Sequence, residues 1–256
     1  MIRLDPAFLN VPLTHRALHD VKRGRPENSR AAISAAIEAG YGIEIDVQLS
    51  SDGAAIVFHD YDLKRLAEDS GPIQQRSSAD LSRVILRGSD EGIPALHEVL
   101  DLVAGRTPLL IEIKDQDGVM GANVGRLEQA VARDIEGYDG PIAVMSFNPH
   151  SVQQMAIHAP KVARGLVTSA FDPEDWLLLP RGTRDRLRGI PDYDTVGASF
   201  ISHEVKDLGA DRVADLKTRG ANILCWTVTS KDQEKEARRV AENITFEQYL
   251  AEFPDS

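Results

Sequence analysis

The stretch that decides the fold is GIEIDVQLSSDGAAIVFHD, residues 42–60. Near its start, Glu44 and Asp46 are two positions apart, so on a β-strand they share one face while the aliphatic residues beside them share the other. Such alternation usually indicates an antiparallel sheet with one face in water. Helical patterns follow this segment and a similar one further on, and they favour a parallel sheet that is covered on both faces.

The similar segment is Leu109–Lys114, where Glu112 and Lys114 alternate with two isoleucines. Three carboxylates and a lysine directed into a covered sheet lose their hydration, which is costly unless a metal ion or a charged ligand compensates. The two segments together therefore indicate a functional site.

Strands and helices are expected to alternate along most of the chain. A helix over Arg30–Ala39 should begin after Ser29 and end at Gly40, and others are expected over Ala95–Ala104, after Asn148 and over Ala210–Arg219. The predicted strands are Val11–His15, Gly42–Val47, Ala55–His59, Leu109–Lys114, Ile142–Ser146, Ala163–Thr168, Thr195–Phe200 and Asn222–Val228. This alternation predicts an α/β fold, the (β/α)₈ TIM barrel.

A doubly wound open sheet is the structural alternative. No G-x-G-x-x-G follows any predicted strand, so its usual dinucleotide-binding function has no support. Two stretches interrupt the alternation: the polar Lys64–Gly92, expected to be an insertion after the third strand, and the long connection Phe171–Asp194. Residues 1–256 are predicted to form one barrel domain, with 64–92 as a small subdomain within it.

The barrel prediction requires functional side chains at the carboxyl ends of the strands. His15 ends the first predicted strand, Asp46 lies near the end of the second, and His59 ends the third. The other side chains of this kind at or near strand ends are Lys114, Ser146 and Trp226. The candidate functional residues therefore collect at one mouth of the expected barrel.

Composition limits the classes of partner. The chain has 256 residues, 42% of them hydrophobic and 27% charged, as in soluble globular proteins. A formal net charge of −11 argues against nucleic-acid binding and against electrostatic adhesion to anionic membranes. With no signal-peptide core, no run of eighteen apolar residues and a single cysteine, Cys225, that is expected to be buried, we predict a cytoplasmic protein without a stable membrane anchor. The oligomeric state stays unknown.

From residue 14 to residue 228 the motifs resemble those of the glycerophosphodiester phosphodiesterases, (β/α)₈-barrel enzymes that use a divalent cation. The family pattern runs His-Arg-Gly, Pro-Glu-Asn-Thr, Glu-x-Asp-Val, Asp-Gly, His-Asp, Glu-x-Lys and Trp-Thr-Val. The corresponding motifs here, in the same order, are His15-Arg16-Ala17, Pro26-Glu27-Asn28-Ser29, Glu44-Ile45-Asp46-Val47, Asp52-Gly53, His59-Asp60, Glu112-Ile113-Lys114 and Trp226-Thr227-Val228, with Ser146-Phe147 between the last two.

The resemblance implies metal-dependent hydrolysis of small-molecule glycerophosphodiesters to sn-glycerol 3-phosphate and an alcohol. Position by position, it implies metal ligation by Glu44, Asp46 and Glu112, acid–base catalysis by His15 and His59, phosphate binding by Arg16 and Lys114, and a substrate-facing aromatic side chain at Trp226. An all-oxygen ligand set suits Mg²⁺ or Ca²⁺, with Mn²⁺ as a further candidate, and matches Zn²⁺ poorly.

The expected chemistry leaves two points open. One histidine would take a proton from the nucleophile and the other would protonate the leaving alkoxide, each contributing roughly 10²–10⁴-fold. The sequence does not say which histidine has which role. It also does not say whether water attacks directly or a glycerol hydroxyl first gives a cyclic phosphate.

The chain departs from the family pattern at two places. Ala17 replaces the usual glycine, which costs about 1 kcal/mol or more if the position requires a positive φ. Where the family often has Asp-Gly-Ile-x-Thr-Asp-x-Pro after Trp226, this chain reads Asn243-Ile244-Thr245-Phe246-Glu247, so the last barrel segment is expected to close differently.

Several side chains also have plainer interpretations. Lys114 could simply pair with Glu112, Trp226 could be barrel packing, and Trp176 is expected to pack rather than line the site. The remaining histidines are expected at the surface or on helices, with His203 the strongest exception because it follows the seventh predicted strand. These histidines are His19, His97, His150, His158 and His203.

Two rival functions remain. A phospholipase-type lyase on intact lipids would need an apolar lip at the site, and the polar Lys64–Gly92 segment offers little of one. A non-catalytic barrel that binds phosphorylated ligands should have lost a catalytic group, whereas both histidines and all three carboxylates are present. We therefore expect an enzyme that prefers deacylated diesters.

Overall fold

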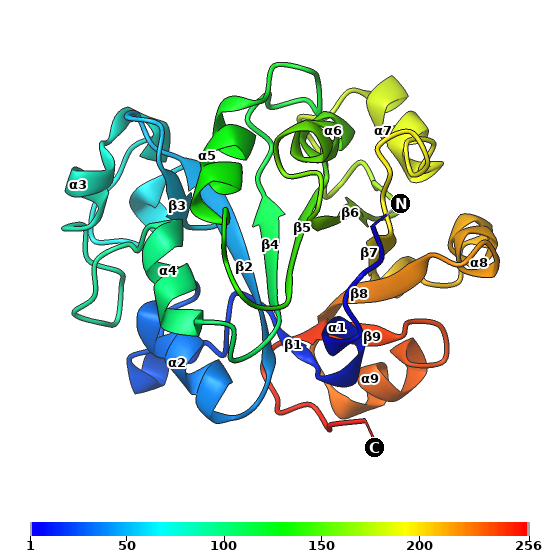
Figure 1. The fold of residues 1–256 in the computed structure, drawn as a ribbon, viewed down its shortest axis with the longest axis horizontal. Helices are drawn as coiled ribbons and strands as arrows, with labels where there is room; N and C mark the ends of the chain where they lie inside the picture. Colours follow the sequence, from blue (N-terminus) through cyan, green and yellow to red (C-terminus); the bar gives the residue numbers. More distant parts are fainter. Residues whose placement is uncertain (1, 255–256) are drawn as a thin grey trace.

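The computed structural model describes residues 2–254, which form a closed barrel of eight parallel strands with helices around it (Figure 1). The barrel strands are β1 (Leu13–Thr14), β2 (Gly42–Leu49), β4 (Leu109–Ile113), β5 (Ile142–Ser146), β6 (Ala163–Thr168), β7 (Phe200–Glu204), β8 (Asn222–Val228) and β9 (Asn243–Phe246). The barrel closes because β1 pairs in parallel with both β2 and β9. The predicted (β/α)₈ architecture is confirmed.

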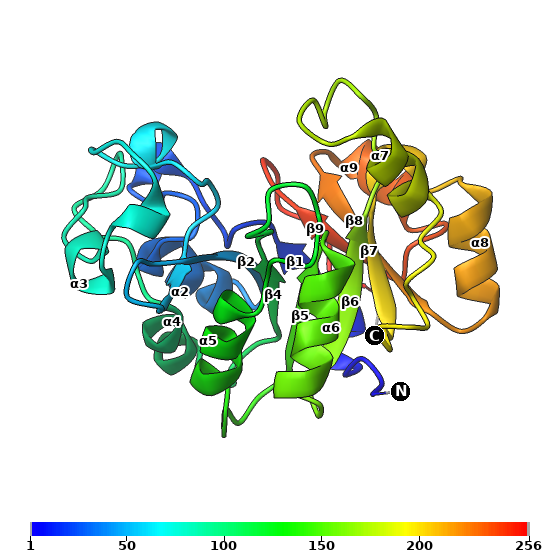
Figure 2. The ribbon, with the colours of Figure 1, turned by 90° about the horizontal axis from the view of Figure 1, so that it is seen from above.

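Most of the helices lie outside the strands (Figures 1 and 2). The helices are α1 (Ala7–Asn10), α2 (Arg30–Glu38), α3 (Ser78–Leu81), α4 (Leu96–Val103), α5 (Arg126–Asp134), α6 (Pro149–His158), α7 (Arg181–Arg188), α8 (Asp211–Thr218) and α9 (Lys231–Ala237). Local sequence sets their ends as expected: Ser29 caps α2 by accepting a hydrogen bond from the Ala32 amide, and Asn148 caps α6. No helix within residues 2–254 has the length and apolar character needed to cross a membrane.

The alternation in β2 places charge inside the barrel and aliphatic side chains outside. Ile43, Ile45 and Val47 are fully buried against the surrounding helices, each such burial contributing roughly 1.5–3 kcal/mol. Inside the barrel, an apolar layer fills the part nearest the amino ends of the strands. This layer contains Phe8, Leu13, Leu110, Ala143, Ala163, Phe200 and Leu224. It supports the layer of functional side chains above it.

The third predicted strand, Ala55–His59, is not a barrel strand. Its first residues form β3 (Ala55–Val57), which pairs antiparallel with β2. The short connection explains the difference, because the Ser50 amide donates to the Ala54 carbonyl in a tight turn, whereas a parallel partner needs a crossover of about a dozen residues. The eighth barrel strand is instead β9, which the sequence pattern does not predict.

The seventh strand is displaced from its predicted position. Thr195–Phe200 is mostly a turn in which Gly197 has φ +64°, and β7 begins only at Phe200. The β-branched Thr195 and Val196 suggested a strand, but Val196 instead packs in the core between barrel and helices. As a result, His203 lies within the strand rather than after it.

Residues 64–92 lie beside the barrel, on the left in Figures 1 and 2. Three short helical turns, η2 (Leu63–Arg65), η3 (Ile73–Gln75) and α3, are held by an apolar cluster of their own. The cluster includes Phe58, Leu63, Ile73, Leu81, Leu86 and Ile93. Its assignment as a separate subdomain stays a prediction.

Candidate active site

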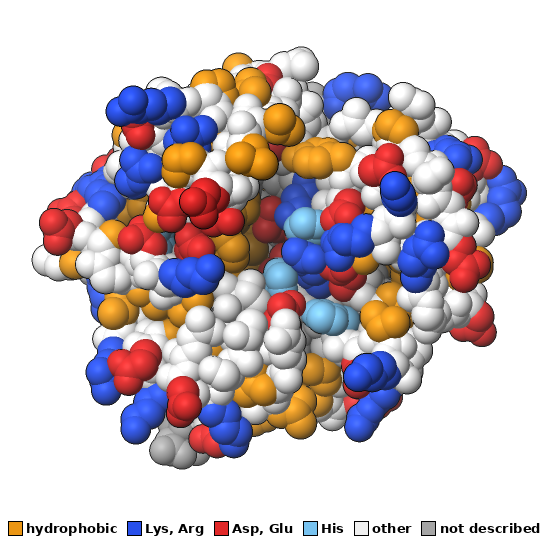
Figure 3. All heavy atoms as spheres, turned by 180° about the vertical axis from the view of Figure 1, so that it is seen from behind, with side chains coloured by type: hydrophobic (Ala, Val, Ile, Leu, Met, Phe, Trp, Pro, Cys, Tyr) orange, Lys and Arg blue, Asp and Glu red, His pale blue; other side chains and the backbone are white. Residues whose placement is uncertain are grey.

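A cavity of about 350 Å³ opens at the carboxyl ends of the barrel strands. Figure 3 shows the hollow, with histidine and charged side chains gathered around it and hydrophobic side chains on its border. The lining residues are His15, Arg16, Glu44, His59, Asp60, Tyr61, Glu112, Lys114, Asp115, Met120, Met145, Phe147, Val167, Trp176, Trp226 and Thr245. The barrel therefore brings most of the predicted site residues to one place, and Asp46 lies directly behind them.

Three buried carboxylates form the most strongly charged part of the site. Asp46 of β2 stands opposite Glu112 of β4 in the parallel register, and Glu44 lies one inward position below Asp46. Their oxygens lie within 4.8 Å of one another. Burial, together with the negative charges of Asp46 and Glu112, raises the pKa of Glu44 well above its usual value. Three carboxylates buried away from solvent need a positive charge to offset their repulsion. Because all their donor atoms are oxygens, the site suits a hard divalent cation.

Lys114 already supplies part of that positive charge. Its Nζ lies 2.8 Å from Oδ1 of Asp46 and 2.7 Å from Oε1 of Glu112. Burial alone would lower the pKa of Lys114, but the two carboxylates outweigh burial and raise it, so the ammonium stays charged. The structure thus contains the pairing of Lys114 with Glu112 that the sequence allowed, and the side chain also faces the cavity.

Arg16 is the second cation of the site. Its guanidinium donates to Glu27, and its Nε lies 3.6 Å from Oδ2 of Asp46. That Nε is buried and has no hydrogen-bond partner among residues 2–254. A buried donor without an acceptor is costly, so this position suits an anionic ligand oxygen.

The loop that carries Arg16 also shapes the carboxylate site. Arg16 and Ala17 both have positive φ values, +52° and +64°. In this conformation the Arg16 amide donates to the Glu44 carboxylate at 2.8 Å, and the Ala17 amide donates to the Glu44 backbone oxygen at 2.9 Å. Position 17, where the family usually has glycine, therefore does adopt the left-handed conformation, which costs alanine about 1 kcal/mol or more. Asn28 completes the loop by donating to Asp46 at 2.9 Å.

His59 reaches the cavity although it does not end a barrel strand. Its Nδ1 lies 2.6 Å from Oδ1 of Asp60, and its backbone oxygen accepts from Gln48 at 3.0 Å. Burial would raise the pKa of Asp60, but hydrogen bonds from Arg65 and His59 outweigh burial and hold it below its usual value. The ionised carboxylate favours the ring tautomer with its proton on Nδ1.

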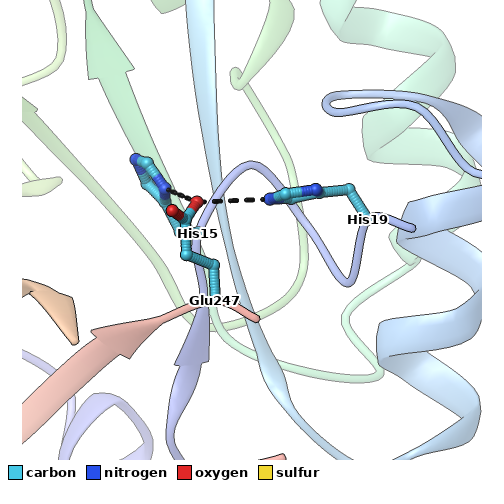
Figure 4. A group of neighbouring side chains, drawn as sticks. All are labelled: His15, His19 and Glu247. Atoms are coloured by element: carbon cyan, nitrogen blue, oxygen red, sulfur yellow. Dashed lines mark hydrogen bonds and ion pairs between the residues drawn. The ribbon is translucent and has the colours of Figure 1, made fainter. Parts of the chain in front are cut away.

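His15 has an equivalent carboxylate partner from the other end of the chain. Its Nδ1 lies 2.7 Å from Oε2 of Glu247, which follows β9, and Nε2 of His19 lies 3.3 Å from the same oxygen (Figure 4). Burial lowers the pKa of His15, and the bond to Glu247 opposes that effect. The sequence pattern did not identify Glu247, and it predicted His19 to be a surface or helix residue. Aligned on Ile244, the second aspartate of the family pattern falls on Glu247, and this signal could have identified it.

Aromatic side chains form the opposite wall. The Trp226 ring lines the cavity, and its Nε1 donates to the Ser202 carbonyl at 3.0 Å. Phe147 contacts Trp226 and Trp176 edge to face, with ring centroids 5.5 Å and 4.9 Å away. Trp176 therefore both packs, as expected, and lines the site. This wall is mainly apolar, and suits carbon atoms rather than charge.

Two other candidates are structural. His203 is buried within β7 and contacts the Thr168 hydroxyl at 2.7 Å and a carboxylate oxygen of Asp207 at 3.1 Å, away from the cavity. Ser146 donates to the Ile113 carbonyl at 2.7 Å. Cys225 is also buried, which raises the pKa of its thiol to about 12.

Comparison with known proteins connects this geometry to one family. The sequence profile of the glycerophosphoryl diester phosphodiesterase family matches residues 15–243. A glycerophosphodiester phosphodiesterase from Caldanaerobacter subterraneus is 27% identical over 216 residues, which cover 81% of this chain and 82% of that protein.

Two solved structures share the fold. An Oleispira antarctica phosphodiesterase in complex with the product sn-glycerol-3-phosphate has a TM-score of 0.75 at 23% identity, with 95% of each chain covered. A Parabacteroides distasonis glycerophosphodiester phosphodiesterase has a TM-score of 0.71 at 22% identity, with 93% of this chain and 92% of that chain covered. Since the family profile spans most of the sequence, the chain belongs to the glycerophosphoryl diester phosphodiesterase family and is a phosphoric diester hydrolase.

Proposed function

We propose that the enzyme hydrolyses glycerophosphodiesters to sn-glycerol 3-phosphate and an alcohol, with His15 and His59 as the general acid–base pair. The observation that carries the proposal is the matched pair of histidine–carboxylate contacts, 2.7 Å and 2.6 Å long. Both histidines line the cavity that Glu44, Glu112, Arg16 and Lys114 also line. The Oleispira antarctica phosphodiesterase, whose fold is shared, was solved with sn-glycerol-3-phosphate as its product, which supports this choice of product.

Glu44, Asp46 and Glu112 would hold one divalent cation, Mg²⁺ or Ca²⁺, with Mn²⁺ as a third candidate. The residues fit such an ion because they offer oxygen donors only, lie within 4.8 Å of one another and are buried with a charge that Lys114 offsets only in part. When bound, a hard divalent cation supplies charge neutralisation at the phosphate and so favours the approach of a nucleophile.

Arg16 and Lys114 would bind the phosphodiester itself. The unpartnered Nε of Arg16 can donate to a phosphate oxygen, and the Lys114 ammonium adds a second positive charge beside it. Both side chains are fixed by carboxylates, Arg16 by Glu27 and Lys114 by Asp46 and Glu112. The phosphate would therefore meet donors that are already in place.

The two histidines would move protons at their Nε2 atoms. Glu247 and Asp60 accept from Nδ1 of His15 and His59, which leaves each Nε2 free to accept a proton from a nucleophile or, when protonated, to give one to the leaving alkoxide. Following the phosphorus species by ³¹P NMR during turnover would distinguish direct attack by water from a route through a cyclic phosphate, which would appear as a transient species.

The aromatic wall would contact the carbon atoms of the glycerol. A cavity of about 350 Å³ lies at the small end of the range for ligand sites, so it suits a glycerophosphate group with a small alcohol and not two acyl chains. We therefore propose deacylated diesters such as glycerophosphoethanolamine and glycerophosphocholine as the preferred substrates.

One observation favours a second candidate function on lipids. Leu177 and Leu178 follow Trp176 and are 81% and 89% exposed, which gives the aromatic side of the cavity an apolar edge that the sequence did not predict. An edge of this kind could contact an aggregated lipid, as the phospholipase-type rival requires.

The test is kcat/KM for the two soluble diesters beside an intact phospholipid in mixed micelles. We expect the soluble diesters to be preferred. A preference for the lipid of about tenfold or more, which corresponds to about 1.4 kcal/mol of transition-state stabilisation, would replace the proposal with the lipid-directed activity. If the diesters and the phospholipid bind but none is hydrolysed with Mg²⁺, Ca²⁺ or Mn²⁺, a non-catalytic barrel would be favoured.

A further inference from the structure

Two imidazole rings and a carboxylate meet just outside the carboxylate site. His15 follows β1, His19 lies in the loop after it, and Glu247 follows β9. Nδ1 of His15 and Nε2 of His19 approach the same Glu247 oxygen at 2.7 Å and 3.3 Å, from opposite sides (Figure 4). One donor atom from each residue lies within 4.8 Å of the other two. The ends of β1 and β9 and the loop after β1 thus hold together three side chains that can ligate a metal.

The donor set differs from that of the buried carboxylates. Two imidazole nitrogens and one carboxylate oxygen are ligands that Zn²⁺ prefers, whereas Mg²⁺ and Ca²⁺ prefer oxygen donors. The charge of Glu247 is also available, because its ion pairs within residues 2–254 are with His15 and His19 and not with a lysine or arginine. The two clusters would therefore select different ions.

The mixed cluster can be reached from solvent by its own route. The side chains of His15, Glu247 and His19 are 16%, 20% and 24% exposed, in contrast to the buried carboxylates. His19 and Glu247 line a second hollow, of about 900 Å³, that does not include the lining residues of the active-site cavity. An ion could therefore arrive while substrate occupies the active site.

We propose that His15, His19 and Glu247 form a second metal site that binds Zn²⁺ and that its occupation inhibits the enzyme. The site itself does not depend on the proposed function, but the inhibition rests on it. A metal bound through Nδ1 of His15 uses that lone pair, so the single ring proton of the neutral imidazole must sit on Nε2. The ring then has no free lone pair to take a proton, and its Nε2 proton is not released near neutral pH. His15 can act neither as base nor as acid in that state.

The experiment titrates Zn²⁺ into enzyme that is saturated with Mg²⁺. In His19→Gln the side-chain amide can still donate a hydrogen bond to Glu247, but the imidazole ligand is gone. We expect the wild type to be inhibited, and His19→Gln to keep near wild-type turnover while needing at least about tenfold more Zn²⁺ for half inhibition. His158→Gln, which removes an exposed histidine elsewhere, is the matched control and should behave like the wild type.

Zn²⁺ binding is measured separately, by calorimetry in excess Mg²⁺. We expect one binding event in the wild type and in His158→Gln, and its loss in His19→Gln. Circular dichroism checks that each variant is folded, and His19→Asn serves as the second variant if His19→Gln is not.

Three outcomes decide the proposal. Equal inhibition of the wild type and His19→Gln would place the inhibitory ion on the carboxylates and overturn it. Absence of Zn²⁺ binding by the Mg²⁺-saturated wild type would overturn it as well. If Zn²⁺ binds in a His19-dependent way but no diester is hydrolysed under any condition, the second site is supported and the proposed function fails.

Discussion

The first and second halves of the barrel bring different chemistry to the same cavity. β1, β2, β4 and the residues directly after them supply His15, Glu44, Glu112 and Lys114, all of them charged or titratable. The side chains from the later strands are mainly apolar and include Met145, Phe147, Val167 and Trp226. The arrangement separates groups that can act on a phosphate from groups that can only contact carbon. Substitutions of the charged lining residues should therefore change kcat, and those of the apolar lining residues should change KM.

The largest effect on the charged half should come from metal removal. EDTA should abolish activity, and Mg²⁺, Ca²⁺ or Mn²⁺ should restore it, because the buried carboxylates otherwise repel the phosphodiester. Glu112→Gln should lose activity that added metal does not recover. Activity assays after dialysis against chelator test this, and full activity of the chelated enzyme would contradict the carboxylate metal site.

The next largest effect should come from the histidines. His15→Ala and His59→Ala should each lower kcat by about two to four decades, and the double variant should lose much less than the product, because the pair works as a unit. Substrates with poor leaving groups are required, since a good leaving group needs no acid. Near wild-type turnover of either single variant would remove that residue from the mechanism.

Glu247→Gln should have a smaller effect with a characteristic pH signature. Burial lowers the pKa of His15 and Glu247 opposes this, so removal of the carboxylate should lower that pKa further. The limb of the pH profile of kcat/KM that belongs to His15 should move to lower pH, and kcat should fall about 10- to 100-fold. Glu247→Asp is the matched control and should recover part of the loss. An unmoved limb would mean that Glu247 does not act through His15.

Substitutions of the apolar lining residues should mainly change KM. Trp226→Leu should raise KM for soluble diesters about tenfold and change kcat by no more than about threefold, because it removes contact with the glycerol carbons and no charge. Steady-state kinetics with glycerophosphocholine measure both constants. A fall in kcat with unchanged KM would show that the two halves are not separate in function.

The smallest effect is expected at the exposed edge of the apolar half. Leu177→Ser combined with Leu178→Ser should leave kcat/KM for soluble diesters within about twofold, as is usual for exposed positions. The activity of the same variant on micellar phospholipid should also be measured and compared with that of the wild type. A selective loss on lipid would give the apolar half a role in lipid contact.

The sequence predicted the elements whose signal is local. β5, β6 and β8 begin and end at the predicted residues, and Ser29 and Asn148 mark helix starts through short-range capping bonds. β3 was wrongly predicted to be a parallel barrel strand, whereas it pairs antiparallel with β2, because an apolar run looks the same in parallel and antiparallel pairing. β9 was missed because its four residues alternate polar and apolar without a long run.

The candidate site divides in the same way. Strand periodicity predicts that Glu44 and Asp46 share one face, the family resemblance adds Glu112 to them, and the structure brings the three together. Glu247 could not be predicted from local pattern, since it is 232 positions from His15, and only barrel closure makes them neighbours. The sequence alone did not show whether residue 17 has a positive φ, because the identity of one residue does not determine its backbone angles; the structure shows that it does.

The pairing of β1 with β9 has a consequence for the time course of folding. Most barrel strands pair with a strand that is near in sequence, but β1 and β9 are more than 200 residues apart. Contacts between segments so distant in sequence form slowly, because a long loop must close first. The His15–Glu247 contact lies at the ends of these two strands. On dilution from denaturant, the helical circular dichroism signal should therefore return before enzymatic activity. The delay between the two reports the time that β1 and β9 need to pair.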